Sequence, residues 1–347
     1  IGSAEGKRLL ETVLPTGSYV EPHFCRGRSN ERQACEPVAI DKIVITMGLS
    51  QGCACTAFPP WGYMREPLAA QEPPLRMRLL PNGAGGGRAS MSKISPLAYI
   101  HPEARIGENC EIGAFCYIDK GVVIGDNNTL MNSVTVLYGA RIGNGNIFFP
   151  GAVISAIPQD LKFRGEDTTA EIGDNNKIRE NVTINRGTAA KGKTVVGSNN
   201  LLMEGAHVAH DAKVGNECII GNSTKLAGEI VIDDKAILSA SVLMHQFCRV
   251  GSYCMVGGGT RFSQNILPFS LVARDPASFC GLNVVGLRRR GFSRELIDNI
   301  HQAYRIILQD TGKLNDLLQR VENEIPMSPE IQYILDFIRT SERGFIR

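Results

Sequence analysis

A bulky apolar residue recurs at every sixth position of this 347-residue chain between residues 100 and 262. Of the 28 positions on that grid, 25 hold Ile, Leu, Val, Met or Phe. A period of six fits neither the 3.6-residue turn of an amphipathic helix nor the two-residue alternation of an isolated strand. It indicates short strands joined by tight corners, three to a coil, with every eighteenth residue stacked at the interstrand spacing of about 4.8 Å. The sequence therefore predicts a parallel β-helix of hexapeptide repeats.

Two further features of the repeat fit a narrow three-sided prism. The residue two places before each apolar position is usually small, so one large and one small inward side chain can fill each face. Five of the ten cysteines occupy that small position: Cys110, Cys116, Cys218, Cys248 and Cys254. We expect these to be buried thiols in a reducing compartment. Glycine often follows the apolar residue, as at Gly107 and Gly113, where we expect corners with unusual φ.

The N-terminal quarter of the chain differs from the rest. Residues 1–90 lack the period, contain two Pro-Pro pairs and end in a glycine-rich run. This composition predicts a disordered or non-native N-terminal extension. Because the chain begins at Ile1 and Met91 stands just before the first repeat, we expect translation to start naturally at Met91.

Two segments follow the extension. Residues 91–268 are expected to form the β-helix and to carry the catalytic site. Residues 269–347 are expected to form a small C-terminal α-helical domain, because apolar residues there recur at helical spacing. Ser293 and Ser328 are the expected N-caps of two of its helices, and a further helix is expected over 313–324.

Charge and hydropathy exclude several classes of protein. The 37 basic and 35 acidic residues nearly balance, which gives no electrostatic case for binding nucleic acid. No apolar run reaches the roughly 18 residues that a membrane span needs, and the N-terminus lacks the apolar core of a signal peptide. We therefore expect a soluble cytoplasmic protein with no membrane span.

The repeat is interrupted twice. Asp160 and Glu166 occupy grid positions inside a charged segment, 158–166. The second interruption, 186–193, is basic and glycine-rich. On composition alone, each interruption could equally be a solvated surface loop without a functional role.

The segment 207–211, His-Val-Ala-His-Asp, holds the strongest chemical signal. Stacking by 18 places Gly228 over His210, and Gln246 over Gly228. A histidine beside a carboxylate can remove a proton from an alcohol. A glycine one layer away leaves room for a carbonyl to approach a backbone N–H, which is what an oxyanion needs. This column predicts acyl transfer from a thioester to a hydroxyl.

The same histidines could serve other chemistry. Some β-helix enzymes of this repeat type hold zinc with three imidazoles, but no third histidine occupies the stacked position one coil above or below His207 or His210. We expect no metal and no redox cofactor. A metal-dependent hydratase, a structural role for His210 in a catalytically silent scaffold, and a related N-acyltransferase with a folded N-terminal domain stay as alternatives.

From residue 92 to the end, the sequence resembles the bacterial UDP-N-acetylglucosamine O-acyltransferase family, which begins lipid A synthesis. The segment Ile184-Asn185-Arg186 is similar to a Bacteroides-like branch of it. The motifs that carry the resemblance are Gln159-Asp-Leu-Lys162, Gly165-Glu166, Ile178-Arg-Glu180, Asn200-Leu-Leu-Met203, Ala206-His-Val-Ala-His-Asp211, Leu226-Ala-Gly228, His245-Gln-Phe247, Gly286-Leu-Arg-Arg-Arg-Gly-Phe292 and Arg343-Gly-Phe-Ile-Arg347.

The resemblance implies a left-handed coil, a homotrimer with its sites between neighbouring prisms, and transfer of a 3-hydroxyacyl chain from acyl carrier protein to the sugar 3-hydroxyl. It implies His210 as general base, Asp211 as its partner and the Gly228 N–H as oxyanion donor. The binding site for the sugar nucleotide and the acyl chain would be lined by Gln159, Asp160, Lys162, His207, His245 and Gln246.

Three further residues match family positions with a role in binding. Asn283 and Arg289 match residues that hold the pantetheine arm or the nucleotide. Gly258 matches the position that measures acyl length, where a missing side chain suggests a longer chain. The sequence departs from the family pattern at three binding positions: Asn185 and Pro276, where some members have His, and Val285, where Glu is common.

Overall fold

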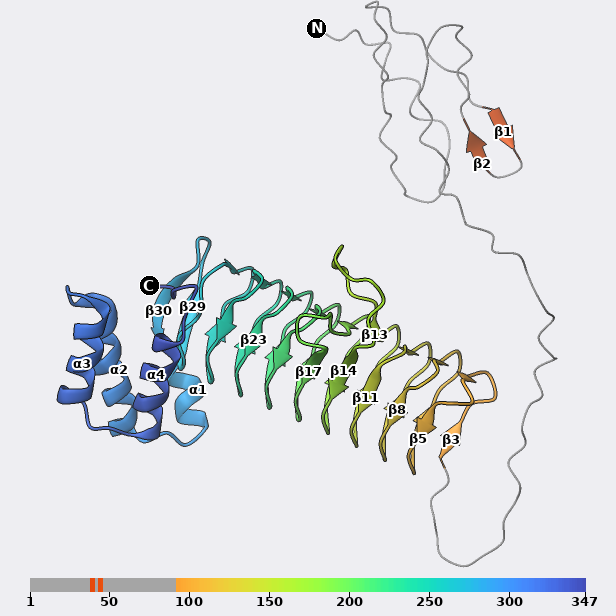
Figure 1. Cartoon of the computed structure of the whole chain (residues 1–347), viewed down its shortest axis with the longest axis horizontal. Helices are drawn as coiled ribbons and strands as arrows, with labels where there is room; N and C mark the ends of the chain where they lie inside the picture. Colours follow the sequence, from red (N-terminus) through yellow and green to blue (C-terminus); the bar gives the residue numbers. More distant parts are fainter. Residues whose placement is uncertain (1–37, 41–42, 46–91) are drawn as a thin grey trace, which may run out of the picture. The chain divides into compact units, whose positions relative to one another are not determined.

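The computed structural model describes residues 38–40, 43–45 and 92–347 (Figure 1). Strands β1 (Val38–Ile40) and β2 (Ile43–Ile45) pair antiparallel and belong to the first of two units into which the chain divides. Apart from these strands, the expectations of an extension over residues 1–90 and of a start at Met91 lie outside the described residues.

The second unit winds into a β-helix whose strands are mostly two residues long (Figure 1). From β3 to β28, consecutive strands belong to different sheets, and each strand pairs with the third strand along the chain. The pairing is parallel, and in a regular coil it joins every eighteenth residue, as Thr135 with Val153. The fold is a left-handed parallel β-helix of hexapeptide repeats followed by a small helical domain, as predicted.

Three sheets form the sides of the prism. The nine-stranded sheet contains β4 (Tyr99–Ile100), β7 (Tyr117–Ile118), β10 (Thr135–Val136), β13 (Val153–Ala156), β16 (Thr183–Asn185), β19 (His207–Val208), β22 (Lys225–Leu226), β25 (Leu243–Met244) and β28 (Arg261–Phe262). The eight-stranded sheet contains β5 (Arg105–Ile106), β8 (Val123–Ile124), β11 (Ala140–Ile142), β14 (Thr169–Ile172), β17 (Lys193–Val196), β20 (Lys213–Val214), β23 (Val231–Ile232) and β26 (Arg249–Val250). The eleven-stranded sheet contains β3 (Lys93–Ile94), β6 (Glu111–Ile112), β9 (Thr129–Leu130), β12 (Ile147–Phe148), β15 (Lys177–Ile178), β18 (Leu201–Leu202), β21 (Ile219–Ile220), β24 (Ile237–Leu238), β27 (Met255–Val256), β29 (Ser270–Ala273) and β30 (Ser278–Leu282).

The interior of the prism is filled as the repeat predicts. The large grid residues are buried from Ile112 onward, and so are the five cysteines at the small inward position. Burial raises the pKa of the Cys218 thiol to about 11 and that of Cys254 to about 12.

At the corner between the eight- and eleven-stranded sheets, a buried ladder of asparagine side chains satisfies the backbone inside the prism. Each ladder amide accepts a hydrogen bond from the next coil, as Asn128 does from the Asn146 backbone N–H at 2.8 Å. The ladder consists of Asn128, Asn146, Asn176 and Asn200.

The expected role of the repeat glycines was wrong. The left-handed backbone falls two residues later, at positions such as Asn109 and Phe115, whereas Gly107 and Gly113 have no positive φ. A Cβ on Gly113 would instead lie 2.8 Å from the Met131 carbonyl carbon in the next coil. These glycines are needed because adjacent coils approach closely there, not because the corner strains φ.

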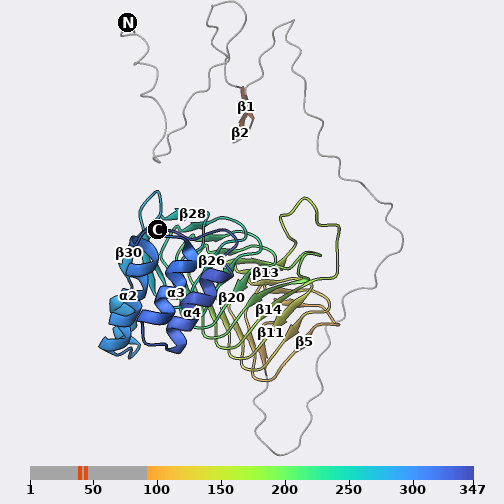
Figure 2. The same cartoon turned by 60° about the vertical axis from the view of Figure 1, so that its left-hand side comes forward.

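Both interruptions of the repeat are loops that leave the end of the nine-stranded sheet. Val153 pairs with Thr183, two hexapeptides beyond the regular partner position, and Thr183 pairs with His207, one hexapeptide beyond it. We name residues 157–168 the first loop and 186–192 the second loop; the first stands out from the coil after β13 in Figure 2. Asn185 Nδ2 donates to the Ile157 carbonyl at 2.9 Å and so fastens the base of the first loop.

The C-terminal segment begins with strands that the sequence did not predict. Strand β29 extends the eleven-stranded sheet and turns back antiparallel into β30. The helices are α1 (Val284–Arg289), α2 (Arg294–Gln309), α3 (Leu314–Glu324) and α4 (Pro329–Arg339). The Ser293 and Ser328 caps are confirmed, because each hydroxyl accepts a backbone N–H of its helix. None of the helices in residues 92–347 is long and apolar enough to cross a membrane.

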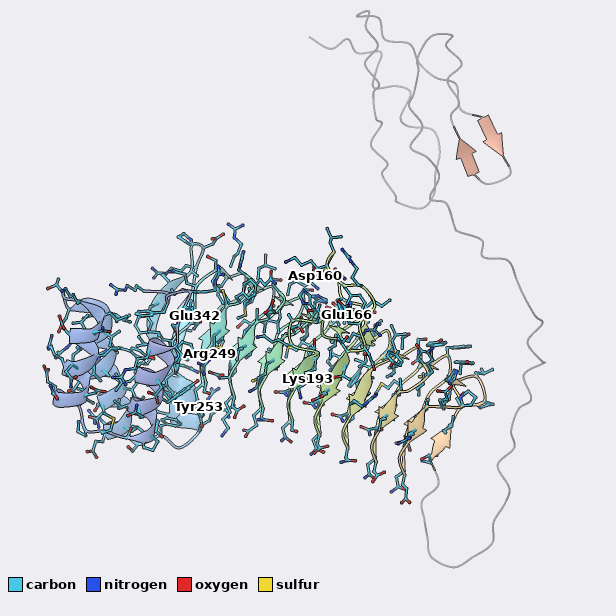
Figure 3. The ribbon with its side chains drawn as sticks, in the orientation of Figure 1. Asp160, Glu166, Lys193, Arg249, Tyr253 and Glu342 are labelled. Carbon is cyan, nitrogen blue, oxygen red and sulfur yellow. The ribbon has the colours of Figure 1, made fainter. Side chains whose placement is uncertain are left out.

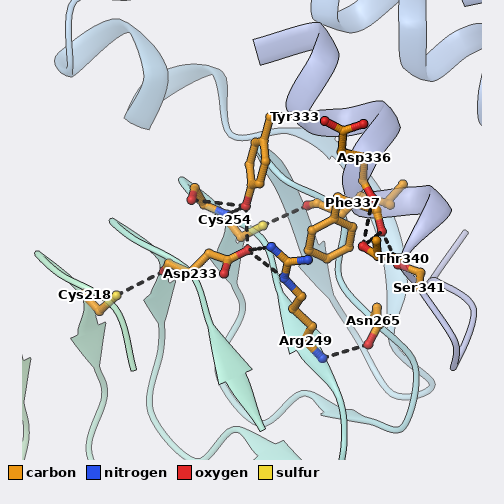
Figure 4. A network of polar contacts seen from close by, with 12 residues as sticks. Cys218, Asp233, Arg249, Cys254, Asn265, Tyr333, Asp336, Phe337, Thr340 and Ser341 are labelled. Atoms are coloured by element: carbon orange, nitrogen blue, oxygen red, sulfur yellow. Dashed lines mark hydrogen bonds and ion pairs between the residues drawn. The ribbon is translucent and has the colours of Figure 1, made fainter. Parts of the chain in front are cut away.

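A polar network joins helix α4 to the coil (Figure 4). Tyr333 donates its hydroxyl hydrogen to Asp233 Oδ2 at 2.6 Å and accepts the Ser252 backbone N–H at 2.9 Å. Arg249 pairs with the same carboxylate at 2.7 Å and lies over the Phe337 ring. Burial, with the nearby Asp233 charge, raises the pKa of Tyr333. The helical domain is thereby fixed to the last coils.

Candidate active site

Most of the predicted site residues gather along one corner of the prism, where the nine-stranded sheet passes into the eight-stranded sheet. Each of five successive coils contributes a segment to this corner, following β13, β16, β19, β22 and β25. Those segments carry, in order, the first loop, the second loop, His210 with Asp211, Gly228, and His245 with Gln246. The stacking predicted for His210, Gly228 and Gln246 is confirmed by the backbone bonds Glu229 N–H to His210 O and Phe247 N–H to Gly228 O.

His210 and Asp211 form a close pair. His210 Nδ1 lies 2.8 Å from Asp211 Oδ2, the carboxylate is fully buried, and 11% of the histidine side chain is exposed. The carboxylate also accepts the Thr188 N–H at 2.9 Å and the Thr188 hydroxyl at 2.6 Å. A carboxylate that accepts all three bonds has no hydrogen to give, so Nδ1 donates to it, and in the neutral imidazole the lone pair is then on Nε2.

Gly228 lies directly against the imidazole. A Cβ on Gly228 would be 2.6 Å from both Cε1 and Nε2 of His210, closer than any side chain can approach. Within residues 92–347, no backbone oxygen accepts a hydrogen bond from the Gly228 N–H. The free Nε2 and an unused backbone donor therefore lie side by side.

A cavity of about 690 Å³ opens on this pair. It is lined by Gln159, His207, Ala209, His210, Lys225, Leu226, Ala227, Gly228, Leu243, Met244, His245, Arg261, Phe262, Ser263, Asp275 and Pro276. His207 Nδ1 lies 2.7 Å from the Thr183 hydroxyl. Burial, followed by the positive charge of Lys225, lowers the pKa of His207, which favours a neutral ring there.

The first loop brings a second carboxylate to the site. Asp160 Oδ2 lies 4.0 Å from His210 Nε2, and Asp160 Oδ1 accepts the Lys162 N–H at 2.9 Å. Figure 3 shows Asp160 and Glu166 on this loop, above the coil. A smaller cavity of about 340 Å³ adjoins the first loop. It is lined by Asp160, Lys162, Glu166, Thr188, Ala189, Ala190, Glu229, Gln246 and Phe247.

Three predicted binding residues lie elsewhere in the chain. Gly258 follows β27, at the corner between the eleven- and nine-stranded sheets, and does not line the His210 cavity. Asn283 is the N-cap of α1, where its side chain bonds the Tyr253 carbonyl and the Gly286 N–H. Arg289 is exposed at the end of that helix. Within one chain, these residues are not brought to His210.

Sequence reasoning missed two groups at the site. Lys225 and Arg261 line the large cavity, and both could have been found by following the stacked column from His207, one coil on and three coils on. Thr188 contacts Asp211 from the second loop, where the broken period gives no stacking rule. Among the residues the structure describes, no group of three His, Cys, Asp or Glu side chains is placed to hold a metal ion.

Comparison with known proteins points to one family. Residues 265–346 match the model described as UDP-N-acetylglucosamine O-acyltransferase, domain 2, and residues 193–228 match the bacterial transferase hexapeptide repeat. The acyl-[acyl-carrier-protein]–UDP-N-acetylglucosamine O-acyltransferase of Thermodesulfovibrio yellowstonii is 42% identical over 258 residues, which are 74% of this chain and 100% of that protein.

Solved structures agree with the sequence matches. A UDP-N-acetylglucosamine acyltransferase from Bacteroides fragilis is 69% identical with a TM-score of 0.72, covering 73% of this chain and 100% of that one. The Campylobacter jejuni enzyme of the same name is 34% identical with a TM-score of 0.69, covering 73% and 99%. With these identities over nearly the whole length of each relative, the chain belongs to the UDP-N-acetylglucosamine O-acyltransferase family, in its Bacteroides-like branch.

Proposed function

We propose that this chain transfers a 3-hydroxyacyl group from acyl carrier protein to the 3-hydroxyl of UDP-N-acetylglucosamine, the first step of lipid A synthesis, with His210 as general base. Membership of the family supports the reaction. The observation that carries the residue assignment is the pair at 2.8 Å between His210 Nδ1 and the buried Asp211 carboxylate, with Nε2 open to a cavity beside the Gly228 N–H.

The proposed chemistry follows from these positions. His210 Nε2 removes the proton of the sugar 3-hydroxyl while the hydroxyl oxygen attacks the thioester carbonyl carbon. The carbonyl oxygen gains the negative charge and accepts the Gly228 N–H. When the tetrahedral intermediate collapses, the C–S bond breaks, and the leaving thiolate takes the proton back from Nε2. Asp211 holds the ring in the required tautomer throughout.

The lining residues fit the two substrates. Gln159, Asp160, Lys162, His207, His245 and Gln246 line the two adjoining cavities and would contact the sugar nucleotide and the acyl chain. Leu243, Met244 and Phe262 also line the large cavity, where they could pack on hydrocarbon. Pro276 lines the same cavity and would restrict it on one side.

A homotrimer is part of the proposal. Gly258, Asn283 and Arg289 lie away from the His210 cavity of their own chain, so they could act in acyl measurement and in holding the pantetheine arm only at a site shared with a neighbour. The nine-stranded sheet also exposes apolar side chains, among them the stacked pair Tyr99 and Tyr117. Such a surface is typical of a face covered by another subunit. The buried thiols support a cytoplasmic location.

Replacement of the proposed base tests the assignment. His210→Ala should lower the acyl-transfer rate by about a hundredfold or more, as loss of a general base does. The assay measures product mass after incubation with UDP-N-acetylglucosamine and 3-hydroxyacyl carrier proteins of different chain lengths, which also reports the preferred acyl length. His101→Ala, in an early coil away from the cavity lining, is the matched control. A folded His210→Ala protein as fast as His101→Ala would remove His210 from the mechanism.

A further inference from the structure

We propose that Thr188 is a positioning residue that controls His210 through the Asp211 carboxylate; this rests on the proposed role of His210 as base. Thr188 belongs to the second loop, and its hydroxyl bonds the carboxylate and not the imidazole. The role is therefore indirect. It concerns the orientation and charge of Asp211 and not contact with either substrate's reacting atoms.

The hydrogen bonds of Thr188 show that its hydroxyl donates to Asp211. Its hydroxyl oxygen accepts the Ala190 N–H at 3.2 Å, which leaves the hydroxyl hydrogen free to be donated. That hydrogen is donated to Asp211 Oδ2 at 2.6 Å, a distance typical of a bond to a charged acceptor. The Thr188 backbone N–H is donated to the other carboxylate oxygen, Oδ1, at 2.9 Å. One residue thus binds both oxygens of the carboxylate.

Asp211 Oδ2 is also the oxygen that accepts His210 Nδ1–H. Thr188 and His210 therefore share one acceptor atom, and the plane of the carboxylate is set by both. The Asp211 side chain has no exposure to water, and Thr188 is only 7% exposed, so water cannot take the place of the hydroxyl without rearrangement. With the hydroxyl removed, the carboxylate keeps the Thr188 backbone N–H on Oδ1, but Oδ2 is held by the His210 imidazole alone, so the ring and the carboxylate can shift together.

The second loop itself supports this role. It lengthens its coil by one hexapeptide, since the stacking partner of Thr183 is His207 and not the residue one regular coil away. The added turn brings Thr188 over the carboxylate, where burial without donors would otherwise cost stability.

Two variants separate the hydroxyl from the rest of the side chain. Thr188→Val removes the hydroxyl at nearly constant volume, and Thr188→Ser keeps it. We expect Thr188→Val to lower kcat by about tenfold to a hundredfold with less than about a threefold change in KM for either substrate. Thr188→Ser should recover most of kcat. A merely structural role would not divide kcat from KM in this way.

Thr224→Val is the matched control, because Thr224 is a buried corner threonine whose hydroxyl donates to the Ser239 carbonyl at 2.8 Å. It should keep the wild-type kcat. If Thr188→Val does not fold, Thr188→Ala carries the same comparison with less bulk. If His210→Ala is inactive but the folded hydroxyl-free variant keeps the wild-type kcat, the role of Thr188 is overturned and that of His210 is not. An active His210→Ala protein would instead overturn the proposed base.

Discussion

Adding one methyl group at Gly228 should disable the site without straining the φ angle of the backbone. Gly228 does not have a positive φ, so alanine can adopt its conformation. The new Cβ would lie 2.6 Å from His210 Cε1 and Nε2, whereas ordinary contact begins at 3.4 Å. The ring or the Gly228 corner must move by the difference, about 0.8 Å.

That displacement is large for catalysis and moderate for stability. A misplacement of about 1 Å at reacting groups costs on the order of a hundredfold in rate. Loss of alignment with an oxyanion donor has a similar or larger effect, so kcat of Gly228→Ala should fall by about a hundredfold to a thousandfold. Overpacking at this corner should lower the free energy of unfolding by about 1–3 kcal/mol.

A double-mutant cycle distinguishes the clash from other causes. In a His210→Ala background, the atoms that the new methyl group meets are absent, so Gly228→Ala should cost almost no further stability. The assays are steady-state acyl transfer and urea unfolding of the four proteins of the cycle. A Gly228→Ala enzyme with kcat within threefold of wild type, or an equal loss of stability in both backgrounds, would refute the reasoning.

Two predictions concern stability away from the site. Tyr333→Phe leaves Asp233 without its 2.6 Å donor and the Ser252 N–H without its acceptor, so the free energy of unfolding should fall by about 1–3 kcal/mol. Tyr99→Phe keeps the ring that stacks on Tyr117 and should change this free energy little; equal urea midpoints for the two variants would contradict the prediction. The thiols of Cys218 and Cys254 ionise near pH 9 when unfolded and only at about 11 and 12 when folded, so their stabilisation is complete below pH 9 and is lost as the pH rises through the folded values. The free energy of unfolding, measured by urea titration from pH 8 to pH 11, should therefore decline by about 1.4 kcal/mol per pH unit for each thiol above pH 9, and Cys254→Ala should decline less steeply.

The coil could be predicted because its interior repeats. Every inward position meets the same surroundings, so Ile154 and Leu226 carry the same information about the fold. The error over the repeat glycines has a physical source in the same regularity. A single strand-and-corner unit suggests strain in φ, but the constraint at Gly113 comes from the neighbouring coil, which only the stacked structure contains.

The end of the coil was harder to predict because the period stops there. Strand β29 continues the eleven-stranded sheet, but its partner β30 runs antiparallel and has no counterpart in the repeat. Helix α1 is only six residues long and is capped by Asn283, too short for a clear apolar pattern. The longer helices α2 and α4 were predictable, because each has a serine cap and a continuous apolar face.

The residues of the site likewise include some that the repeat predicts and some that it does not. His210, Gly228 and Gln246 obey the stacking rule, so their proximity could be read from their spacing. Thr188 does not obey this rule, because the residues added by the second loop change its spacing from Asp211, which is no longer 18. Yet both loops preserve the grid: the step from Val153 to its partner Thr183 exceeds a regular coil by two hexapeptides, and the next step, to His207, exceeds it by one. Because each insertion is a whole number of hexapeptides, the chain re-enters the prism on the same face with the same inward residues. The corner that holds His210 could thus gain two loops, and with them Asp160 and Thr188, without any change in the packing of the coils below.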